Sequence, residues 1–392
     1  MELILIEITR LLYRQMCRTI PTGIDRVCIE YIRHYRPRAR AVLCRGPFCA
    51  VMSEADSHQA FVMLTTPGFG SRWFAWKLIT KAVLWRWLSV VSMPSYLFNV
   101  SHIGLESPFY AWMLRRRGTK LVVMVHDLIP ISNPEYCRPK EFDAHHTRMR
   151  SAATLSSAIV ANSQFTHDAF AKFCNENKLP PPSADVSWLA PGFSAAPRSS
   201  KESSRALEGP YFVVLGTIEA RKNHWLLLQV WRQIVECMGE KAPKLVIIGQ
   251  RGWECENVVD LLERCRALKG VVIERGHCSD AELVVYLRHA QALLFPSFVE
   301  GFGMPLLEAL SLGVPVIASD IAVFREIAGN VPEYAHPLDG RLWEALITDY
   351  AQLSSAKRAA QLERIEGYVP TTWAAHFRVV DALLARLQAT LA

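Results

Sequence analysis

From residue 211 onward, short apolar runs alternate regularly with segments of helix length. The runs are YFVVLG, KLVIIG, VVIERG, ALLFPS and PVIAS, and the helical segments between them begin near His224, Glu256, Asp280 and Pro305. Parallel strands require crossover helices, and strands covered on both faces lose the alternation of polar and apolar residues. The pattern therefore predicts a doubly wound parallel sheet in an α/β fold.

The first half of the chain repeats this pattern less regularly. The runs LFNV, KLVVMVHD and SAIVANS are separated by helical stretches, and GIDRVCIEYIRHY near the start forms an amphipathic helix. A chain of 392 residues suits two domains of ~100 to 200 residues each. We expect Rossmann-like domains over residues 1–190 and 210–368, a Ser-, Pro- and Ala-rich linker over 191–209, and a C-terminal helix within 369–392.

Net charge is unevenly distributed along the chain. Residues 1–195 hold 23 Lys and Arg against 14 Asp and Glu, a balance of +9, and the rest of the chain balances at −2, which returns the total of +7. This asymmetry suits an N-terminal half that meets an anionic surface, either phospholipid or a phosphorylated substrate. A soluble basic face is the alternative.

Residues 72–98 form the most apolar and Trp-rich stretch of the chain. Lys77, Lys81, Arg86 and Pro94 interrupt it well short of the ~20 apolar residues of a membrane-spanning helix. Tryptophans interleaved with cations are typical of a helix that lies in a membrane interface. An apolar helix followed by a strand is also typical of a buried core unit.

The ten cysteines are scattered, without a CxxC pair or the Cys/His spacing of a zinc site. We expect them to be reduced thiols. The N-terminus, MELILIEITRLLYRQ, lacks the order of a signal peptide. We therefore expect a cytoplasmic protein, either free or peripheral on the cytoplasmic face of the membrane.

Two glutamates flank a Gly-Phe-Gly turn in FVEGFGMPLLEAL, residues 298–310. Glu300 follows a predicted strand, and Glu308 lies about one turn into the next helix. Gly301 and Gly303 permit positive φ and close approach of a ligand to the backbone. Amides at a helix N-terminus bind anions and carboxylates accept hydrogen bonds from hydroxyls, so the arrangement indicates a sugar nucleotide. The alternative is a loop glutamate and a surface helix glutamate.

A second candidate element is VVLGTIEARKNHWLLL, residues 213–228, where Arg221 and Lys222 stand directly before a predicted helix. Cations at this position would neutralise the charge that develops on a departing diphosphate. A solvated basic loop is the alternative.

The motif E-G-F-G-x-P-x-x-E at residues 300–308 resembles the signature of the family 4 retaining glycosyltransferases of GT-B fold. The likeness is strongest over residues 211–330, and it extends to PTGIDRV at 21 and VHDLIP at 125. It implies two Rossmann-like domains that face a cleft, with the last helix packing back on the first domain.

The same resemblance implies roles for single residues. Glu308 would hold the nucleotide ribose, and Lys222 would bind the diphosphate. Glu300 and the amides of Gly301, Phe302 and Gly303 would contact the donor sugar. Thr217 stands where the family often has an arginine, which leaves open whether Arg221 supplies the second positive charge.

Three further candidates lie in the first half. His126 ends a buried run, where its imidazole would hydrogen-bond the donor sugar or β-phosphate, with Asp127 orienting it or approaching the acceptor; a core histidine is the alternative. Gly23, at the start of a helix, would let a diphosphate approach the backbone, unless it is an ordinary helix start. Ser163 would contact acceptor or phosphate, or else cap the next helix.

The sequence contains no Asp-x-Asp, no GxGxxG after the first predicted strand and no P-loop. We therefore expect no metal site, no nicotinamide cofactor and no P-loop phosphoryl transfer. The co-substrate would be a nucleoside diphosphate sugar, and nucleic acid is not an expected partner.

The stretches PTGIDRV, HDLIP and IEARKNH resemble those of bacterial transferases that extend lipid-linked oligosaccharides of exopolysaccharide or O-antigen, including α-mannosyltransferases. This resemblance implies transfer of mannose from GDP-mannose to a polyprenyl-diphosphate-linked glycan. A UDP- or dTDP-sugar donor, a nucleotide-sugar epimerase and a non-catalytic sugar-nucleotide-binding membrane scaffold remain alternatives. Loops near Arg251 and His277 would select the base and the hexose.

Overall fold

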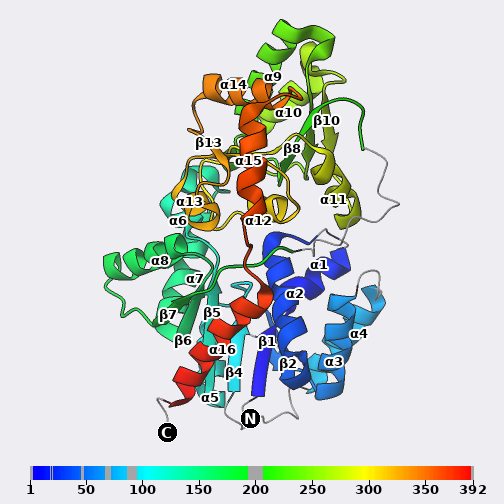
Figure 1. Cartoon of the computed structure of the whole chain (residues 1–392). Helices are drawn as coiled ribbons and strands as arrows, with labels where there is room; N and C mark the ends of the chain where they lie inside the picture. The colour runs from blue at the N-terminus through cyan, green and yellow to red at the C-terminus, as the bar shows by residue number, and fades with distance from the viewer. Residues whose placement is uncertain are drawn as a thin grey trace. The chain divides into compact units, whose positions relative to one another are not determined.

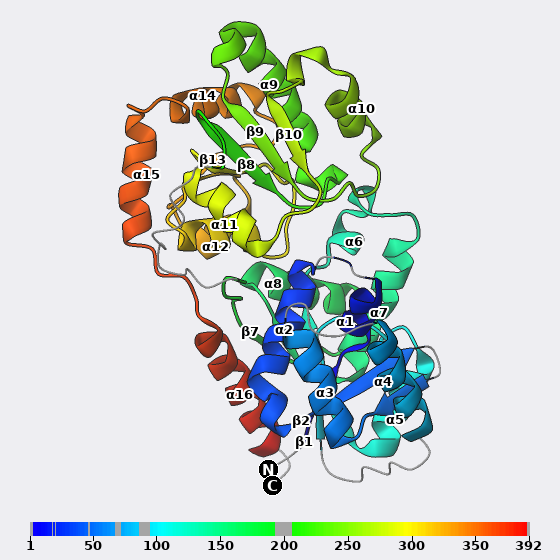
Figure 2. The same cartoon turned by 90° about the vertical axis from the view of Figure 1, so that its right-hand side faces the viewer.

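The computed structural model describes residues 3–17, 19, 21–45, 48–66, 72–85, 95–192 and 206–389. The chain divides into two compact units (Figures 1 and 2). Unit 1 consists of Met1–Ser132, Pro139–Leu189 and Thr372–Ala392, and unit 2 consists of Asn133–Arg138 and Ala190–Thr371. Most of the expected linker 191–209, and residues 86–94 of the Trp-rich stretch, lie outside the described residues.

Unit 1 is built on a seven-stranded sheet in the order β3-β2-β1-β4-β5-β6-β7. All neighbouring strands pair in parallel except β3, which pairs antiparallel with β2. The strands are β1 Leu3–Glu7, β2 Ala39–Arg45, β3 Phe48–Val51, β4 Ser95–Asn99, β5 Thr119–Val125, β6 Ser156–Ala161 and β7 Ser183–Val186. The central strands β4 and β5 are almost completely buried, which explains their continuous apolar sequence.

Most helices of unit 1 lie between its strands in the sequence, and α16 joins them from the end of the chain. They are α1 Thr9–Cys17, α2 Gly23–Tyr35, α3 Glu54–Thr65, α4 Arg72–Trp85, α5 Pro108–Arg117, α6 Ile129–Ser132, α7 Glu141–Leu155, α8 Gln164–Glu176 and α16 Trp373–Ala389. Helix α2 coincides with the amphipathic helix that the sequence predicts. Among the described residues, no helix is long and apolar enough to cross a membrane.

Helix α16 lies beside α2 in both views (Figures 1 and 2). Phe377 of α16 packs edge-on against Tyr31 of α2, with ring centroids 5.1 Å apart. The buried His376 contacts the Tyr31 hydroxyl at 3.1 Å and the Ser187 hydroxyl at 2.9 Å. The end of the chain is therefore an integral part of the core of unit 1.

Cys44 and Cys49 form a disulfide between β2 and β3. They are directly opposite each other in the antiparallel register, with Cα atoms 4.2 Å apart. The expectation that all ten cysteines are reduced is wrong at this pair, because the sequence did not reveal the hairpin that brings the two residues together.

Unit 2 is built on a six-stranded parallel sheet in the order β10-β9-β8-β11-β12-β13. Its strands are β8 Tyr211–Leu215, β9 Lys244–Ile248, β10 Val272–Arg275, β11 Leu293–Phe295, β12 Val316–Ser319 and β13 Glu333–Ala335. Its helices are α9 His224–Met238, α10 Glu256–Arg264, α11 Asp280–His289, α12 Met304–Ser311, α13 Ala322–Ala328, α14 Gly340–Tyr350 and α15 Ala356–Glu366. The two sheets, which are parallel except for the edge strand β3, confirm the predicted Rossmann-like fold class.

Candidate functional site

The sheet of unit 2 has a topological switch point between β8 and β11. The chain runs outward from β8 through β9 to β10 and then returns to place β11 on the other side of β8. Ligands of open α/β sheets bind beyond the carboxyl ends of the strands at such a point. Arg221 and Lys222 follow β8 and Glu300 follows β11, so the topology brings these three predicted site residues together.

Glu300 is buried and holds both cations. Its Oε1 accepts from Lys222 Nζ at 2.5 Å and from the Ser297 hydroxyl at 2.8 Å, and its Oε2 accepts from Arg221 Nη1 at 2.8 Å. Burial acts to raise the pKa of Glu300, but Arg221 and Lys222 outweigh it and lower the pKa to about 2. Glu300 is therefore ionised at neutral pH. A carboxylate accepts about four hydrogen bonds, so roughly one acceptor position remains for a sugar hydroxyl.

A second buried carboxylate, Glu219, completes the cluster. Arg221 Nε lies 2.6 Å from Glu219 Oε1. Burial raises the pKa of Glu219, and it also lowers the pKa of Lys222, a shift that Glu300 opposes. Two carboxylates thus balance two cations, so that neither cation is buried without a counter-charge. Glu219 and Ser297 were not among the predicted site residues, although each contacts a predicted residue of its own loop, Glu219 contacting Arg221 and Ser297 contacting Glu300.

Backbone geometry fixes the loop that carries Lys222. Asn223 adopts the left-handed conformation, with φ of 55°, and its side-chain amide donates to the carbonyls of Pro296 and Pro337 at 3.2 and 2.8 Å. Gly216 has φ of +138°, and a Cβ there would lie 3.4 Å from Lys222 Cε. Asn223 therefore links the loop after β8 to the loop after β11, and the positive φ of Gly216 favours glycine at that position.

The Gly-Phe-Gly turn leads into α12. Gly303 precedes the helix with φ of +110°, and a Cβ there would lie 2.7 Å from a ring carbon of Phe324. Both the conformation and the space require glycine. Phe302 is buried, so its backbone, rather than its ring, is the part that suits the predicted donor contact.

Glu308 is buried in α12 and accepts a hydrogen bond from the backbone N–H of Gly192 at 3.2 Å. The carboxylate thus holds the chain just before residue 193 against unit 2. Its predicted contact with a ribose stays a prediction.

Arg251 and His277 follow β9 and β10. The guanidinium of Arg251 makes a bidentate ion pair with Glu274, with N···O distances of 2.8 and 2.9 Å, and a further ion pair with Glu263 at 2.5 Å. On the surface of unit 2, Arg251 is therefore held by two glutamates, Glu263 and Glu274. The selection of base or hexose at these two residues stays a prediction.

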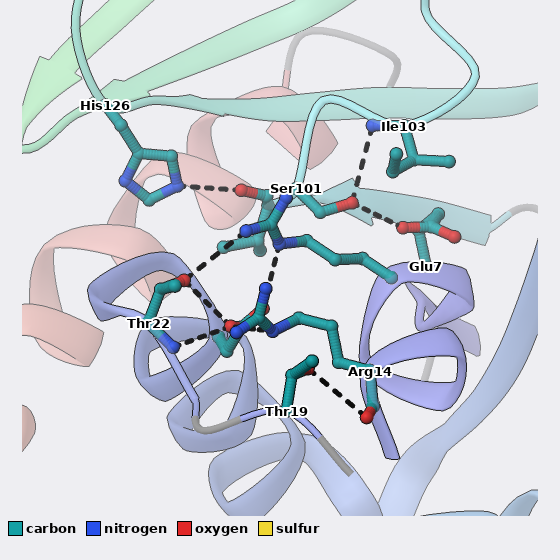
Figure 3. A network of polar contacts seen from close by, with 10 residues as sticks. Glu7, Arg14, Thr19, Thr22, Ser101, Ile103 and His126 are labelled. Carbon is teal, nitrogen blue, oxygen red and sulfur yellow. Dashed lines mark hydrogen bonds and ion pairs between the residues drawn. The ribbon is translucent and has the colours of Figure 1, made fainter. Parts of the chain in front are cut away.

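Unit 1 has its own switch point, between β1 and β4. Figure 3 shows the polar network at the ends of these strands and of β5. His126, which follows β5, is buried, and its Nε2 lies 2.7 Å from the carbonyl oxygen of Val100 after β4 (Figure 3). Because a carbonyl only accepts, Nε2 carries the hydrogen and Nδ1 is an acceptor. Burial lowers the pKa of His126, so the ring is neutral at pH 7.

Asp25 lies at the centre of the same network. It is buried in the first turn of α2 and pairs with Arg10 Nε and Arg14 Nε, both at 2.8 Å. Its Oδ2 also accepts from the N–H of Thr22 at 2.7 Å, which fixes the start of the helix. Gly23 follows as an exposed residue, with no atom within 4 Å of a Cβ built on it. The backbone at Gly23 is thus open to a ligand, and Arg10 and Arg14 are cations that the sequence analysis missed.

The remaining candidates of unit 1 have structural partners. Ser163 caps α8, because its hydroxyl accepts from the N–H of Thr166 at 3.0 Å. Of the two interpretations of Ser163, the structure shows the cap. Asp127 accepts from the N–H of Ile129 at 3.1 Å at the start of α6.

Among the described residues, no group of three or more His, Cys, Asp or Glu side chains has the arrangement to hold a metal ion.

The fold is that of the GT-B glycosyltransferases. Superposition on HepE of Anabaena in complex with UDP-glucose gives a TM-score of 0.65 at 16% identity, over 98% of this chain and 99% of that chain. Sucrose-phosphate synthase from Thermosynechococcus elongatus gives a TM-score of 0.65 at 14% identity, over 100% of both chains. These likenesses establish the fold.

Residues 196–332 match the family described as glycosyl transferases group 1. Arg221, Lys222, Glu300 and Glu308 all lie in this segment. The chain therefore carries a group 1 glycosyl transferase domain and is a glycosyltransferase.

Several similar curated proteins are mannosyltransferases, and others are D-inositol 3-phosphate glycosyltransferases. O-antigen chain mannosyltransferase B of Escherichia coli is 28% identical over 264 residues, which are 64% of this chain and 68% of that protein. O-antigen chain mannosyltransferase RfbU of Salmonella typhimurium is 26% identical over 253 residues, 63% of this chain and 64% of that protein. Serotype-specific mannosyltransferase WbdA of Escherichia coli is 28% identical over 229 residues, which span only 28% of its length.

Proposed function

We propose that the protein transfers a hexose from a nucleoside diphosphate sugar to a lipid-linked oligosaccharide, with retention of the anomeric configuration. The best candidate for the donor is GDP-mannose. The names of the similar mannosyltransferases support mannose and a surface-polysaccharide acceptor. The polyprenyl diphosphate carrier and the place of action on the cytoplasmic face of the membrane are part of the proposal.

The observation that carries the proposal is the pair of cations, Arg221 and Lys222, held by Glu300 at the switch point of unit 2. The reaction breaks the bond between the anomeric carbon and a β-phosphate oxygen, and the electron pair stays on the diphosphate. The acceptor hydroxyl oxygen bonds to the anomeric carbon and releases its proton. Fixed cations lower the barrier because they stabilise the negative charge as it develops on the leaving group.

Glu300 and Glu219 prepare the two cations for this task. They balance the charge before the donor binds, so the site does not bury an unpaired lysine. A diphosphate that approaches Lys222 would share its ammonium hydrogens with Glu300, since an ammonium group has three donors and the lysine uses one on this carboxylate. The positions of the cations therefore change little on binding, which reduces the cost of reorganisation.

The other predicted residues would orient the donor. The amides of Gly301, Phe302 and Gly303 would meet the sugar, and Glu308 would accept from the ribose hydroxyls. The neutral imidazole of His126 would accept a hydrogen bond from a sugar hydroxyl at Nδ1. These roles concern binding and orientation, whereas the cations act on the leaving group.

A panel of donors tests the proposed reaction. GDP-, UDP- and dTDP-sugars are incubated with the purified protein and membrane-extracted lipid acceptors, and the product linkage is read by NMR. We expect transfer from one donor class, GDP-mannose first, with the α-configuration retained and with rates that are unchanged by EDTA. No transfer from any donor, or an inverted product, would contradict the proposal. Interconversion of the sugar without transfer would instead indicate an epimerase.

Lys222→Ala tests the cation directly. We expect kcat/KM to fall by about 10²- to 10³-fold, the usual effect of removing one group that stabilises a developing oxyanion. The matched control is Lys241→Ala, because Lys241 is an exposed lysine of the same unit. Thermal unfolding verifies that both variants are folded at the assay temperature.

A further inference from the structure

Helix α4 presents tryptophans to solvent. Trp73 is 74% exposed and Trp76 is 55% exposed, while Ala75 and Leu78 on the opposite side of the helix are buried in unit 1. Large aromatic side chains contribute most to stability when they are buried, so two neighbouring exposed tryptophans require another explanation.

The exposed side of α4 is also basic. Arg72, Lys77 and Lys81 are exposed with the two tryptophans, and the helix contains no acidic residue. Lys81 forms an ion pair with Asp56 of α3 at 2.9 Å. Lys77 Nζ lies 6.0 Å from the ring centroid of Trp73. Aromatic rings beside cations are typical of surfaces that enter the headgroup region of a membrane.

We propose that the outer face of α4, defined by Arg72, Trp73, Trp76 and Lys77, docks on an anionic phospholipid bilayer. The rings would lie at the boundary between headgroups and acyl chains, and the cations would meet lipid phosphates. The sign of the charge favours a lipid surface, since Arg72 and Lys77 complement an anionic leaflet. At 14 residues, α4 is shorter than the ~20 residues of a spanning helix, so it lies in the plane of the surface.

This inference deepens the proposed function, on which it rests for its biological purpose. An acceptor that is anchored by a lipid is confined to the membrane surface. Docking through α4 raises the local concentration of the enzyme at the membrane surface, where the acceptor is confined.

Co-sedimentation with vesicles tests the proposal on the full chain. We expect the wild-type protein to partition into vesicles of phosphatidylethanolamine and phosphatidylglycerol, and to bind phosphatidylcholine vesicles at least about tenfold more weakly, because each cation near an anionic surface contributes on the order of a fivefold factor. Trp73→Ser combined with Trp76→Ser, and separately Lys77→Glu, should each lower partitioning by about tenfold.

Two tryptophans serve as matched controls. Trp225 of α9 is 45% exposed and lines a shallow surface hollow with Asp260. Trp112 of α5 is 48% exposed, its ring lies tilted against that of Phe109 with centroids 4.8 Å apart, and the Arg116 guanidinium lies 5.1 Å from its ring centroid. Trp225→Ser should keep wild-type partitioning, and Trp112→Ser should lower partitioning less than the α4 variants do.

Several results would overturn the inference. The first is that both α4 variants partition into vesicles like the wild type. The second is that Trp225→Ser loses as much vesicle binding as the α4 variants do. The third is that Trp112→Ser loses vesicle binding while the α4 variants keep it. Self-association of the wild type that the α4 variants abolish, without vesicle binding, would instead assign the face to a second copy of the chain.

Turnover measured without vesicles separates this inference from the proposed function. The α4 variants should release nucleoside diphosphate from the donor at the wild-type rate. A wild-type protein that binds vesicles but uses no donor would contradict the proposed function alone. Sugar transfer by a wild-type protein that does not bind anionic vesicles would contradict only the proposal that α4 docks on a membrane.

Discussion

Glu300→Gln removes the charge that holds Arg221 and Lys222 in place while it keeps the shape of the side chain. The pKa of Glu300 falls from 4.5 to about 2 because the two cations outweigh the effect of burial. Each unit of pKa corresponds to ~1.4 kcal/mol, so the ionised carboxylate contributes about 3 kcal/mol to the stability of the folded protein at pH 7. Because the folded pKa is the lower one, this contribution is present above pH 4.5 and is lost as the pH falls toward 2.

The assay is calorimetric unfolding of a double-mutant cycle. A loss of about 3 kcal/mol in a unit of this size lowers its Tm by roughly 6 to 12 °C. Lys222→Met, which leaves Glu300 with Arg221 alone, should destabilise by a similar amount. The double variant should be less destabilised than the sum of the two single variants, by at least about 1 kcal/mol, because neither charge is then left without its partner.

Glu240→Gln is the matched control, since Glu240 is an exposed carboxylate of the same unit. It should leave the Tm within about 1 °C of the wild-type value. The reasoning would be refuted if Glu300→Gln behaved like this control, or if the two single variants were strictly additive in the cycle.

Three further predictions concern other parts of the chain. Gly303→Ala should lower the Tm more than Gly313→Ala, because both glycines have positive φ but only a Cβ at Gly303 collides with Phe324; equal shifts in thermal unfolding would contradict the steric argument. A change from pH 7 to pH 5.5 should lower the free energy of unfolding by about 1 kcal/mol for each of His224 and His376. Burial lowers their pKa from 6.5 to about 3 and about 4, so these two residues take up protons in this range only in the unfolded chain. When both are replaced by Asn, urea titrations should show a smaller loss of stability between pH 7 and pH 5.5. Deletion of the chain from Trp373 onward should unfold or strongly destabilise unit 1, because it removes the core contacts of α16; a truncated protein with an unchanged Tm and full activity would disprove this.

The periodicity of the sequence was sufficient for most of the fold. The apolar runs from residue 211 onward became β8 to β12, and helices α9, α10 and α11 begin at the predicted residues His224, Glu256 and Asp280. These elements could be predicted from the sequence because each strand is buried on both faces and each helix begins after a clear break in the apolar pattern. The β2–β3 hairpin could not be predicted, since β3, the edge strand, has only four residues and therefore little periodicity.

The candidate site was only partly accessible from the sequence. The motif around Glu300 and the basic pair after β8 identified the loops, but their pairing depends on β11 lying next to β8, and the order of strands in a sheet is a property of the tertiary fold. Glu219 and Ser297 contact site residues of their own loops, but no motif in the sequence marks these two residues. In unit 1, no sequence motif marks Arg10 and Arg14, because the carboxylate that pairs with both, Asp25, comes from the next helix.

The affinity for the diphosphate group tests the central claim most directly. Isothermal titration compares GDP, UDP and the corresponding nucleosides on the wild-type protein, Lys222→Ala and Lys241→Ala. The account predicts that Lys222→Ala weakens binding of the preferred nucleoside diphosphate by at least about tenfold, the effect of losing one charge-assisted hydrogen bond, and leaves nucleoside binding unchanged. Equal diphosphate affinity in Lys222→Ala and the wild type would contradict it.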